Sequence, residues 1–241
     1  MSRPEHDVHT PLQRLRVIAD VHGEAEALLR AADVAPDRHL VLLGDLVDYG
    51  PESGRTLGIA LDLIASGRAT LVRSNHDDRL YRHLIGNPVT PSEMLTTTLA
   101  SIAEAGGAAL ARRFVAAYQA APLWLNVGHY VLAHGAVDPL MIGLDAPPAD
   151  MPRRIRDRVR WLALYGEGRL APGQERPIRT YDWVDQLPAG TTAIVGHDIR
   201  STDAPLVVHG ALGGRVFFLD TGCGKGGHLS TVDLPEEHIA P

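Results

Sequence analysis

The sequence predicts an α/β domain with two packed sheets, and two observations carry this prediction. In the first half, short apolar runs alternate with stretches of helical periodicity, and repetition of strand, loop and helix implies right-handed parallel crossovers with helices covering a sheet. In the second half, several short β-type runs follow one another. A chain of 241 residues can build one sizeable core. We therefore expect a flexible arm over residues 1–13 and a single domain over residues 14–241.

The first half predicts three strands that each end in polar side chains. Residues 15–19 end on Asp20, residues 40–43 end close to Asp45, and residues 70–72 precede Asn75. Residues 24–34 and 55–66 follow the first two strands with helical periodicity. The loops beyond the carboxyl ends of such strands form the binding crevice, so these polar side chains are expected at one sheet edge.

The middle of the chain predicts helices, and the second half predicts mostly strands. Residues 92–120 are expected to be helical with an interruption at 106–107, and residues 153–165 form an Arg-rich helix candidate. Residues 123–127 and 130–133 predict a hairpin that ends at His134. Further strands are expected at residues 193–195, 206–208, 216–219 and 229–232. The segment 222–227 is interpreted as a hairpin and not a phosphate-binding loop, because no helix follows it.

Composition excludes several classes of protein. The formal net charge of −6 argues against a general nucleic-acid-binding surface. No apolar run approaches the roughly 18–20 residues of a membrane span. The N-terminal residues are polar where a signal peptide would be apolar, so we expect a cytoplasmic protein. Cys223 is the single cysteine, which excludes an internal disulfide framework and a cysteine-based zinc ribbon. Its place in the segment 222–227 predicts a buried or half-buried thiol. Lys225 is the single lysine, and genome composition is the simplest reason for the excess of arginine.

Five predicted strand ends carry side chains that can bind metal ions: Asp20 with His22, then Asp45, Asn75, His134 and His197. Such mixed carboxylate, amide and imidazole ligands suit Mn, Fe, Ni or Zn. These polar groups would be costly to bury unpaired at one edge. Two ions that share a carboxylate would satisfy them and would activate water for in-line attack on phosphorus.

The order of these motifs resembles the calcineurin-like metallophosphoesterases. The resemblance rests on residues 20–23, 44–48, 75–77, 134–135 and 196–197. Residues 164–167, 182–183, 220–223 and 226–227 are similar to bacterial diadenosine-tetraphosphatase-type proteins and to the phosphatase domain of bacterial polynucleotide kinase-phosphatases, in the phosphoprotein-phosphatase-like branch. The resemblance implies a four-layer αββα sandwich of two mixed sheets flanked by helices.

The resemblance also implies roles for the polar residues. One metal ion would be held by Asp20, His22 and Asp45, and the other by Asp45, Asn75, His134 and His197, with Asp45 bridging. His76 would protonate the leaving oxygen while Asp48 orients it. A carboxylate partner independently raises a histidine pKa, which keeps a proton available near neutral pH. Manganese is the first expectation for both ions, with iron, nickel and zinc as alternatives.

The chain departs from the family pattern beside this site. Tyr49 stands where the pattern has the arginine that clamps the substrate phosphate, and a phenol cannot supply a bidentate charged fork. Tyr49 itself, Arg79, Arg160 and Arg179 are the candidates for contacting phosphate instead. Ser74 also replaces a glycine, which we interpret as a minor change.

The predicted function is therefore a metal-dependent hydrolase of phosphoric ester or anhydride bonds, in which a metal-bridging hydroxide attacks phosphorus. A small phosphorylated substrate of the nucleotide type is expected, and the oligomeric state is left open. A Ser/Thr phosphoprotein phosphatase is one alternative. A catalytically weak, metal- or nucleotide-binding regulatory protein is another, and only the missing arginine favours it.

Overall fold

Two five-stranded sheets form the centre of the fold. The computed structural model describes residues 14–170, 173–174, 177–235 and 237–240, so the predicted arm at residues 1–13 lies outside the described part. The first sheet has the order β12-β11-β1-β2-β3. Its strands are β1 (Leu15–Ile18), β2 (His39–Leu42), β3 (Ala69–Leu71), β11 (Thr231–Leu234) and β12 (His238–Ala240). β1, β2 and β3 are parallel, and β11 runs antiparallel to β1.

The second sheet has the order β4-β5-β8-β10-β9. Its strands are β4 (Trp124–Val127), β5 (Tyr130–Ala133), β8 (Thr192–Val195), β9 (Leu206–His209) and β10 (Arg215–Phe218). β5, β8 and β10 are parallel, whereas β4 and β9 are antiparallel to their neighbours. Both sheets are thus mixed, as predicted. The helices are α1 (Ala25–Asp33), α2 (Ser53–Ala65), α3 (Asn75–Leu84), α4 (Glu93–Ala105), α5 (Gly107–Ala120) and α6 (Arg153–Tyr165).

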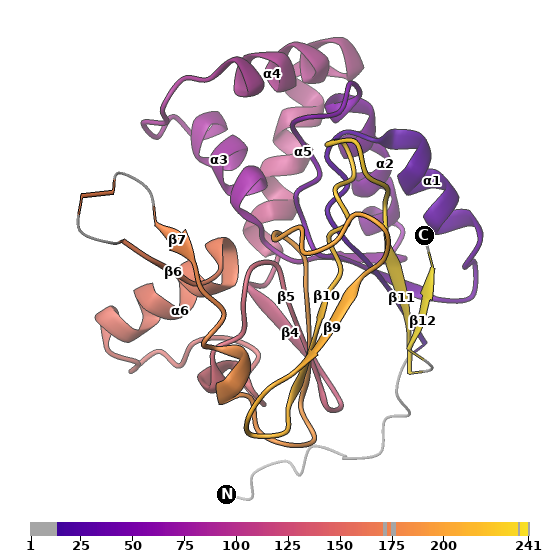
Figure 1. Cartoon of the computed structure of the whole chain (residues 1–241). Helices are drawn as coiled ribbons and strands as arrows, with labels where there is room; N and C mark the ends of the chain where they lie inside the picture. Colours follow the sequence, from indigo (N-terminus) through magenta and orange to yellow (C-terminus); the bar gives the residue numbers. More distant parts are fainter. Residues whose placement is uncertain (1–13, 171–172, 175–176, 236, 241) are drawn as a thin grey trace, which may run out of the picture.

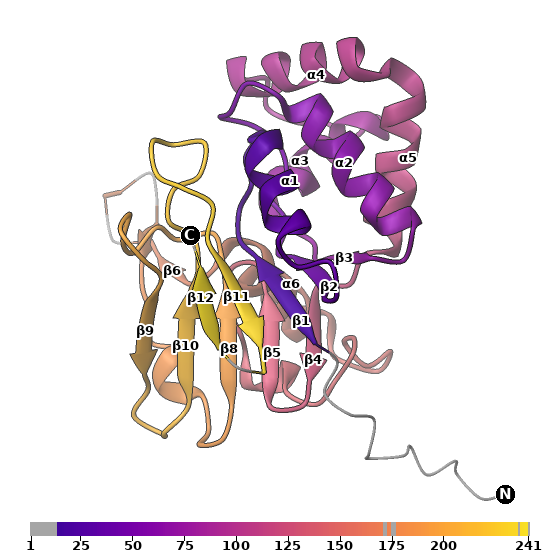
Figure 2. The same cartoon turned by 90° about the vertical axis from the view of Figure 1, so that its right-hand side faces the viewer.

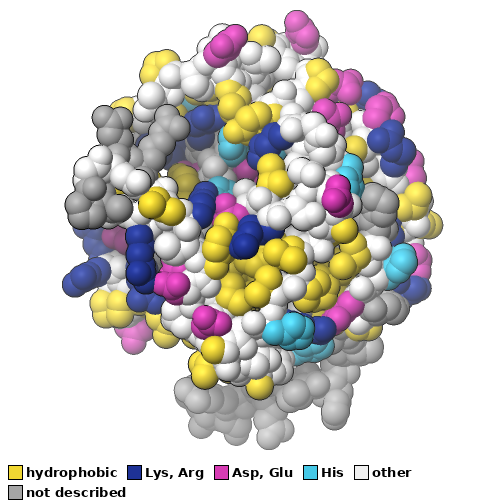
Figure 3. Space-filling model, viewed as in Figure 1, with side chains coloured by type: hydrophobic (Ala, Val, Ile, Leu, Met, Phe, Trp, Pro, Cys, Tyr) yellow, Lys and Arg dark blue, Asp and Glu magenta, His cyan; other side chains and the backbone are white. Residues whose placement is uncertain are grey.

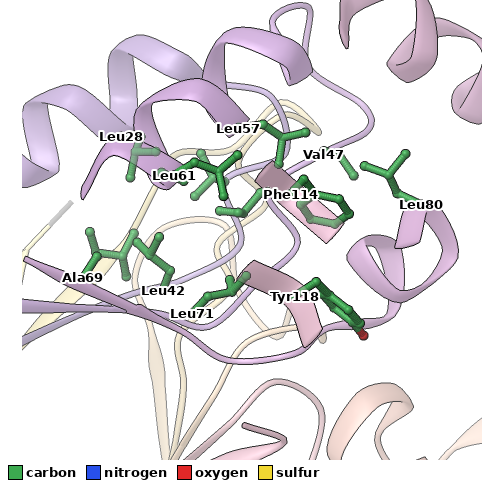
Figure 4. Close-up of a cluster of buried hydrophobic side chains, with 14 of the residues drawn as sticks. Leu28, Leu42, Val47, Leu57, Leu61, Ala69, Leu71, Leu80, Phe114 and Tyr118 are labelled. Carbon is green, nitrogen blue, oxygen red and sulfur yellow. The ribbon is translucent and has the colours of Figure 1, made fainter. Parts of the chain in front are cut away.

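Three apolar layers hold the sheets and helices together. Between the sheets, Val17 and Val41 pack in one cluster with Ile194 of the second sheet. Since side chains alternate along a strand, Ile18 and Leu42 lie in a different cluster, under α1, α2, α4 and α5 (Figure 4). A third cluster joins the second sheet to α6. Figures 1 and 2 show α1–α5 gathered on one side and α6 on the other. The predicted αββα sandwich is therefore confirmed.

The structure contains elements that were not predicted from the sequence, and it shifts one predicted strand. A small hairpin, β6 (Gly168–Arg169) with β7 (Ile178–Arg179), and the edge strand β12 were not predicted. The strand predicted at 229–232 lies instead at Thr231–Leu234. The reason is Asp233, a charge that ends the apolar pattern but pairs across the ladder with Arg16 of β1. Among the described residues, no helix is both long and apolar enough to cross a membrane.

Asp233→Asn is expected to destabilise the first sheet by about 3 kcal/mol, because it leaves the largely buried Arg16 charge without its partner. Arg16 Nε and Nη2 donate to the two Asp233 oxygens over 2.7 and 2.8 Å. Burial raises the pKa of Asp233, but Arg16 and Arg38 outweigh it and hold the pKa below its ordinary value. This contribution is therefore present above pH about 4 and is lost as pH falls through the lowered pKa.

Urea unfolding at pH 7 and at acidic pH measures this effect. Asp37→Asn, which removes the exposed partner of Arg14, is the matched control and should change stability by less than about 1 kcal/mol. Equal stability of the two variants at pH 7 would contradict the prediction.

Candidate active site

All six predicted ligands lie just beyond strands or at the helix start that follows one. Asp20 and His22 follow β1, Asp45 follows β2, Asn75 begins α3 after β3, and His134 and His197 follow β5 and β8. His22, Asp45 and His197 have positive φ values of 46°, 47° and 68°. This backbone region turns the chain sharply directly after each strand.

The ligating atoms form two neighbouring groups that share one carboxylate. Asp20, His22 and Asp45 offer atoms that lie within 4.8 Å of one another, and so do Asp45, His134 and His197. Asn75 joins the second group, because its Oδ1 lies 2.8 Å from His134 Nε2 and 3.0 Å from His197 Nδ1. The structure thus brings together the six residues that the sequence nominated.

Two backbone carbonyls orient the imidazoles. His22 Nδ1 lies 2.9 Å from the Val47 carbonyl and His134 Nδ1 lies 3.0 Å from the Leu43 carbonyl. Since a carbonyl only accepts, each Nδ1 carries the hydrogen and each Nε2 presents its lone pair, the arrangement typical of metal-binding histidines.

The donor set fits divalent cations. His22 Nε2 is buried without a hydrogen-bond partner, yet it lies 3.6 Å from Asp45 Oδ2. Burial lowers the pKa of His22 to about 4 and also lowers the pKa values of His134 and His197, so the imidazoles are neutral at pH 7 and able to bind a cation. A buried lone pair facing carboxylates is costly unless a cation is bound there.

His76 and Asp48 form a pair beside these groups. His76 Nδ1 donates to Asp48 Oδ2 over 2.5 Å, and Thr98 Oγ1 donates to Asp48 Oδ1 over 2.6 Å. Burial lowers the pKa of His76, but the carboxylates of Asp45 and Asp48 outweigh it, so the net pKa lies above its ordinary value. His76 Nε2 lies 4.0 Å from Asp45 Oδ2 and so faces the candidate metal centre.

The four candidates for contacting phosphate occupy different places. Arg79 donates to Asp48 Oδ2 over 2.5 Å and so supports the His76–Asp48 pair. Arg160 donates to Asp78 Oδ1 over 2.7 Å, away from the ligand groups. Arg179 bonds to His197 Nε2 and pairs with Asp198 at 2.9 Å. Tyr49 is half exposed, and its ring centre lies 4.8 Å from that of His22. Tyr49 and Arg179 thus lie closest to the ligands.

Lys225 is a cation that the sequence reasoning did not nominate. Its Nζ lies 4.7 Å from the centre of the Tyr49 ring and 3.9 Å from Asp220 Oδ2. The preceding Gly224 packs on His22, where a Cβ would lie 2.7 Å from the His22 Cβ. The segment 222–227 is a hairpin-like turn, as interpreted, but it also places the positive charge of Lys225 against Tyr49 and Asp220, beside the candidate metal centre. The single lysine in an arginine-rich chain was the available signal.

A cavity of about 370 Å³ opens beside these residues and is lined by Asn75, His76, Arg79, Arg82 and Tyr165, among others. Figure 3 shows Lys and Arg side chains around a hollow in which His side chains are visible. The cavity therefore offers positive charge to an anionic substrate next to the His76–Asp48 pair.

Two ligand groups sharing a carboxylate, with a His–Asp pair alongside, define a metal-dependent phosphoesterase on this fold. The profile of the calcineurin-like phosphoesterases matches residues 13–201. The chain belongs to this family.

Curated relatives cover nearly the whole chain. The asymmetrical bis(5'-nucleosyl)-tetraphosphatases PrpE of Bacillus velezensis and Bacillus subtilis are each 31% identical to it; the alignments cover 91% of this chain and 88% and 90% of the relatives. A crystal structure of a candidate diadenosine tetraphosphatase superposes with a TM-score of 0.62 at 21% identity, covering 96% of this chain and 93% of the other. At that identity the superposition supports the fold alone.

Proposed function

We propose that the chain hydrolyses dinucleoside tetraphosphates asymmetrically, releasing a nucleoside triphosphate and a nucleoside monophosphate. The observation that carries this proposal is the near full-length similarity to relatives named for that activity. The arginine-lined cavity beside His76 supports it, because a polyphosphate chain needs several positive charges. A cytoplasmic location stays a prediction.

The residues proposed to hold two divalent ions, manganese by preference, are those of the two ligand groups. Asp20, His22 and Asp45 would hold one, and Asp45, Asn75, His134 and His197 the other. When bound, the ions supply Lewis-acid charge toward phosphoryl oxygens and lower the pKa of a water nucleophile.

His76 is proposed to act as the general acid. Because Nδ1 donates to Asp48, Nε2 is the atom that holds the transferable proton. As the water oxygen bonds to phosphorus and the anhydride P–O bond breaks, His76 Nε2 donates its proton to the leaving oxygen. Asp48 keeps the ring in the correct tautomer and stabilises its positive form.

Product analysis by chromatography with the manganese-loaded chain tests the proposed function. We expect one triphosphate and one monophosphate from each dinucleoside tetraphosphate, and higher kcat/KM than for an aryl monoester, an aryl diester or a phosphopeptide. Preference for the phosphopeptide would instead favour a phosphoprotein phosphatase. If the chain binds two ions but hydrolyses none of these substrates, the result would favour a regulatory binding protein.

Lys225 and Tyr49 are proposed to replace the missing phosphate-clamping arginine. We expect Lys225→Met to lower kcat/KM roughly 10- to 100-fold, the range for losing a hydrogen bond from a charged donor. Lys225→Arg should recover part of this loss, since it restores a cation. Arg112→Met, which removes an exposed charge of α5, is the control for net charge. Equal activity of Lys225→Met and Arg112→Met would exclude Lys225 from phosphate binding.

A further inference from the structure

Trp161 is an exposed tryptophan that stacks on a neighbouring aromatic ring. Its side chain is 56% exposed, whereas Trp124 and Trp183 are 1% and 3% exposed. Its ring stacks on that of Tyr165, one helical turn further along α6, with ring centres 4.4 Å apart and planes inclined by 25°. Tryptophan usually buries a large apolar area, so this stack leaves an oriented aromatic surface open to solvent.

Tyr165, the inner ring of this stack, also lines the cavity beside His76. A second cavity, of about 340 Å³, is lined by Trp161 and Arg160 and shares Arg82 and Tyr165 with the first. The two cavities are therefore adjacent, with Arg82 and Tyr165 at their common boundary, His76 in one and Trp161 in the other.

Arg82 supplies positive charge at this boundary. Its Nη2 donates to the Pro88 carbonyl over 3.1 Å, and within the described part of the chain it forms no ion pair. The acids of the second cavity are partnered, because Asp78 accepts from Arg160 at 2.7 Å and Asp157 pairs with Arg153 at 3.5 Å. The charge left available at this boundary is positive, which suits phosphate.

We propose that Trp161 and Tyr165 form a stacking platform for the nucleobase of the leaving nucleotide, with Arg82 contacting the phosphate chain between the platform and His76. This inference rests on the proposed function and adds a subsite to it. Because every base has a π-face, such a platform favours nucleotides over base-free phosphates without selecting one base.

The kinetic test uses Trp161→Ala in the manganese-loaded full chain. KM for the dinucleoside tetraphosphate should rise roughly 5- to 150-fold, the range for losing one base–aromatic stack. For inorganic tetraphosphate, which has the same anhydrides and no base, kcat/KM should not change. Trp161→Phe keeps an aromatic face and should stay near wild type. Ile155→Ala truncates another exposed apolar side chain of α6 and is the matched control. A similar loss of kcat/KM for both substrates, or an unchanged KM for the dinucleoside tetraphosphate, overturns the proposal.

A binding measurement separates failure of the platform from failure of the proposed function. If the wild-type chain leaves dinucleoside tetraphosphates intact, the proposed function fails, and nucleotide binding alone decides about the platform. The probe is ATP, added to the metal-loaded His76→Asn variant so that it is not consumed, with inorganic tripolyphosphate as the base-free control. ATP should quench the tryptophan emission of this variant, whereas tripolyphosphate should not. In the double variant that also carries Trp161→Phe, ATP should no longer quench the emission. Equal quenching by both compounds, or quenching that survives Trp161→Phe, excludes the platform.

Discussion

Asp45→Asn is expected to lower hydrolytic activity by at least roughly 100-fold, because outer partners of metal ligands alone cost 10- to 100-fold and Asp45 is common to both ligand groups. Asp45 Oδ2 lies 3.6 Å from His22 Nε2 and 3.5 Å from His134 Nε2. The amide keeps the shape of the side chain but removes the negative charge that both groups use. Metal content per chain and turnover of a dinucleoside tetraphosphate to its two nucleotide products, measured on the same preparation, test this expectation.

Asp77→Asn is the matched control for Asp45→Asn. Asp77 is also buried, but it belongs to neither ligand group. Burial, helped by the charge of Asp45, raises the pKa of Asp77 to about 7, so the amide removes only part of a charge at neutral pH. Its Oδ1 can still accept from the Leu46 N–H. The control should retain both ions. Full metal content and activity in Asp45→Asn would refute the bridging role.

His76→Asn is expected to lower kcat by about 10²- to 10⁴-fold, the usual contribution of a positioned acid or base. Metal content should be unchanged, because His76 lies outside both ligand groups. The loss should depend on the leaving group. A nitrophenolate leaves with little need for a proton, whereas an alkoxide needs one, so aryl monoesters of graded leaving-group pKa provide the measurement.

Asp48→Asn should show the same leaving-group dependence with a smaller loss, since it removes the partner of the acid and not the acid itself. An equal loss in His76→Asn for good and poor leaving groups would mean that His76 does not supply the proton. Because Thr98 and Arg79 also donate to the two Asp48 oxygens in the native chain, a thermal unfolding measurement accompanies the kinetics of this variant.

The candidate metal centre was predictable because its residues obey a local rule. Each ligand lies at or near the end of a short apolar strand, and parallel topology gathers the ends of neighbouring strands at one edge of a sheet. Asp20, Asp45 and Asn75 follow parallel strands of the first sheet and could be placed together by this rule. His134 and His197 follow strands of the second sheet, and only the resemblance to the calcineurin-like metallophosphoesterases assigned them to the same site. The helix α6 was predicted with the bounds the structure has, because its pattern is long and strongly periodic.

Other features were not predictable because they depend on tertiary contacts. Lys225 reaches Tyr49 only because the turn at 222–227 folds over His22. Arg82 and Trp161 line one cavity although they come from separate helices, α3 and α6. The strand pairing of Asp233 with Arg16 likewise joins distant segments. Composition and spacing describe neighbours along the chain, so they carry little information on such pairs.

The pairing of β1 with β11 has a consequence for biosynthesis. Asp20, Asp45 and Asn75 are translated long before His134 and His197, and β1 lacks its antiparallel neighbour until residues 231–234 have been made. Such non-local pairing closes late, because the entropy of long loops must be overcome first. A nascent chain on the ribosome thus exposes an incomplete set of ligands. We expect metal loading to follow translation, so that the ions available to the finished protein decide which metal it carries.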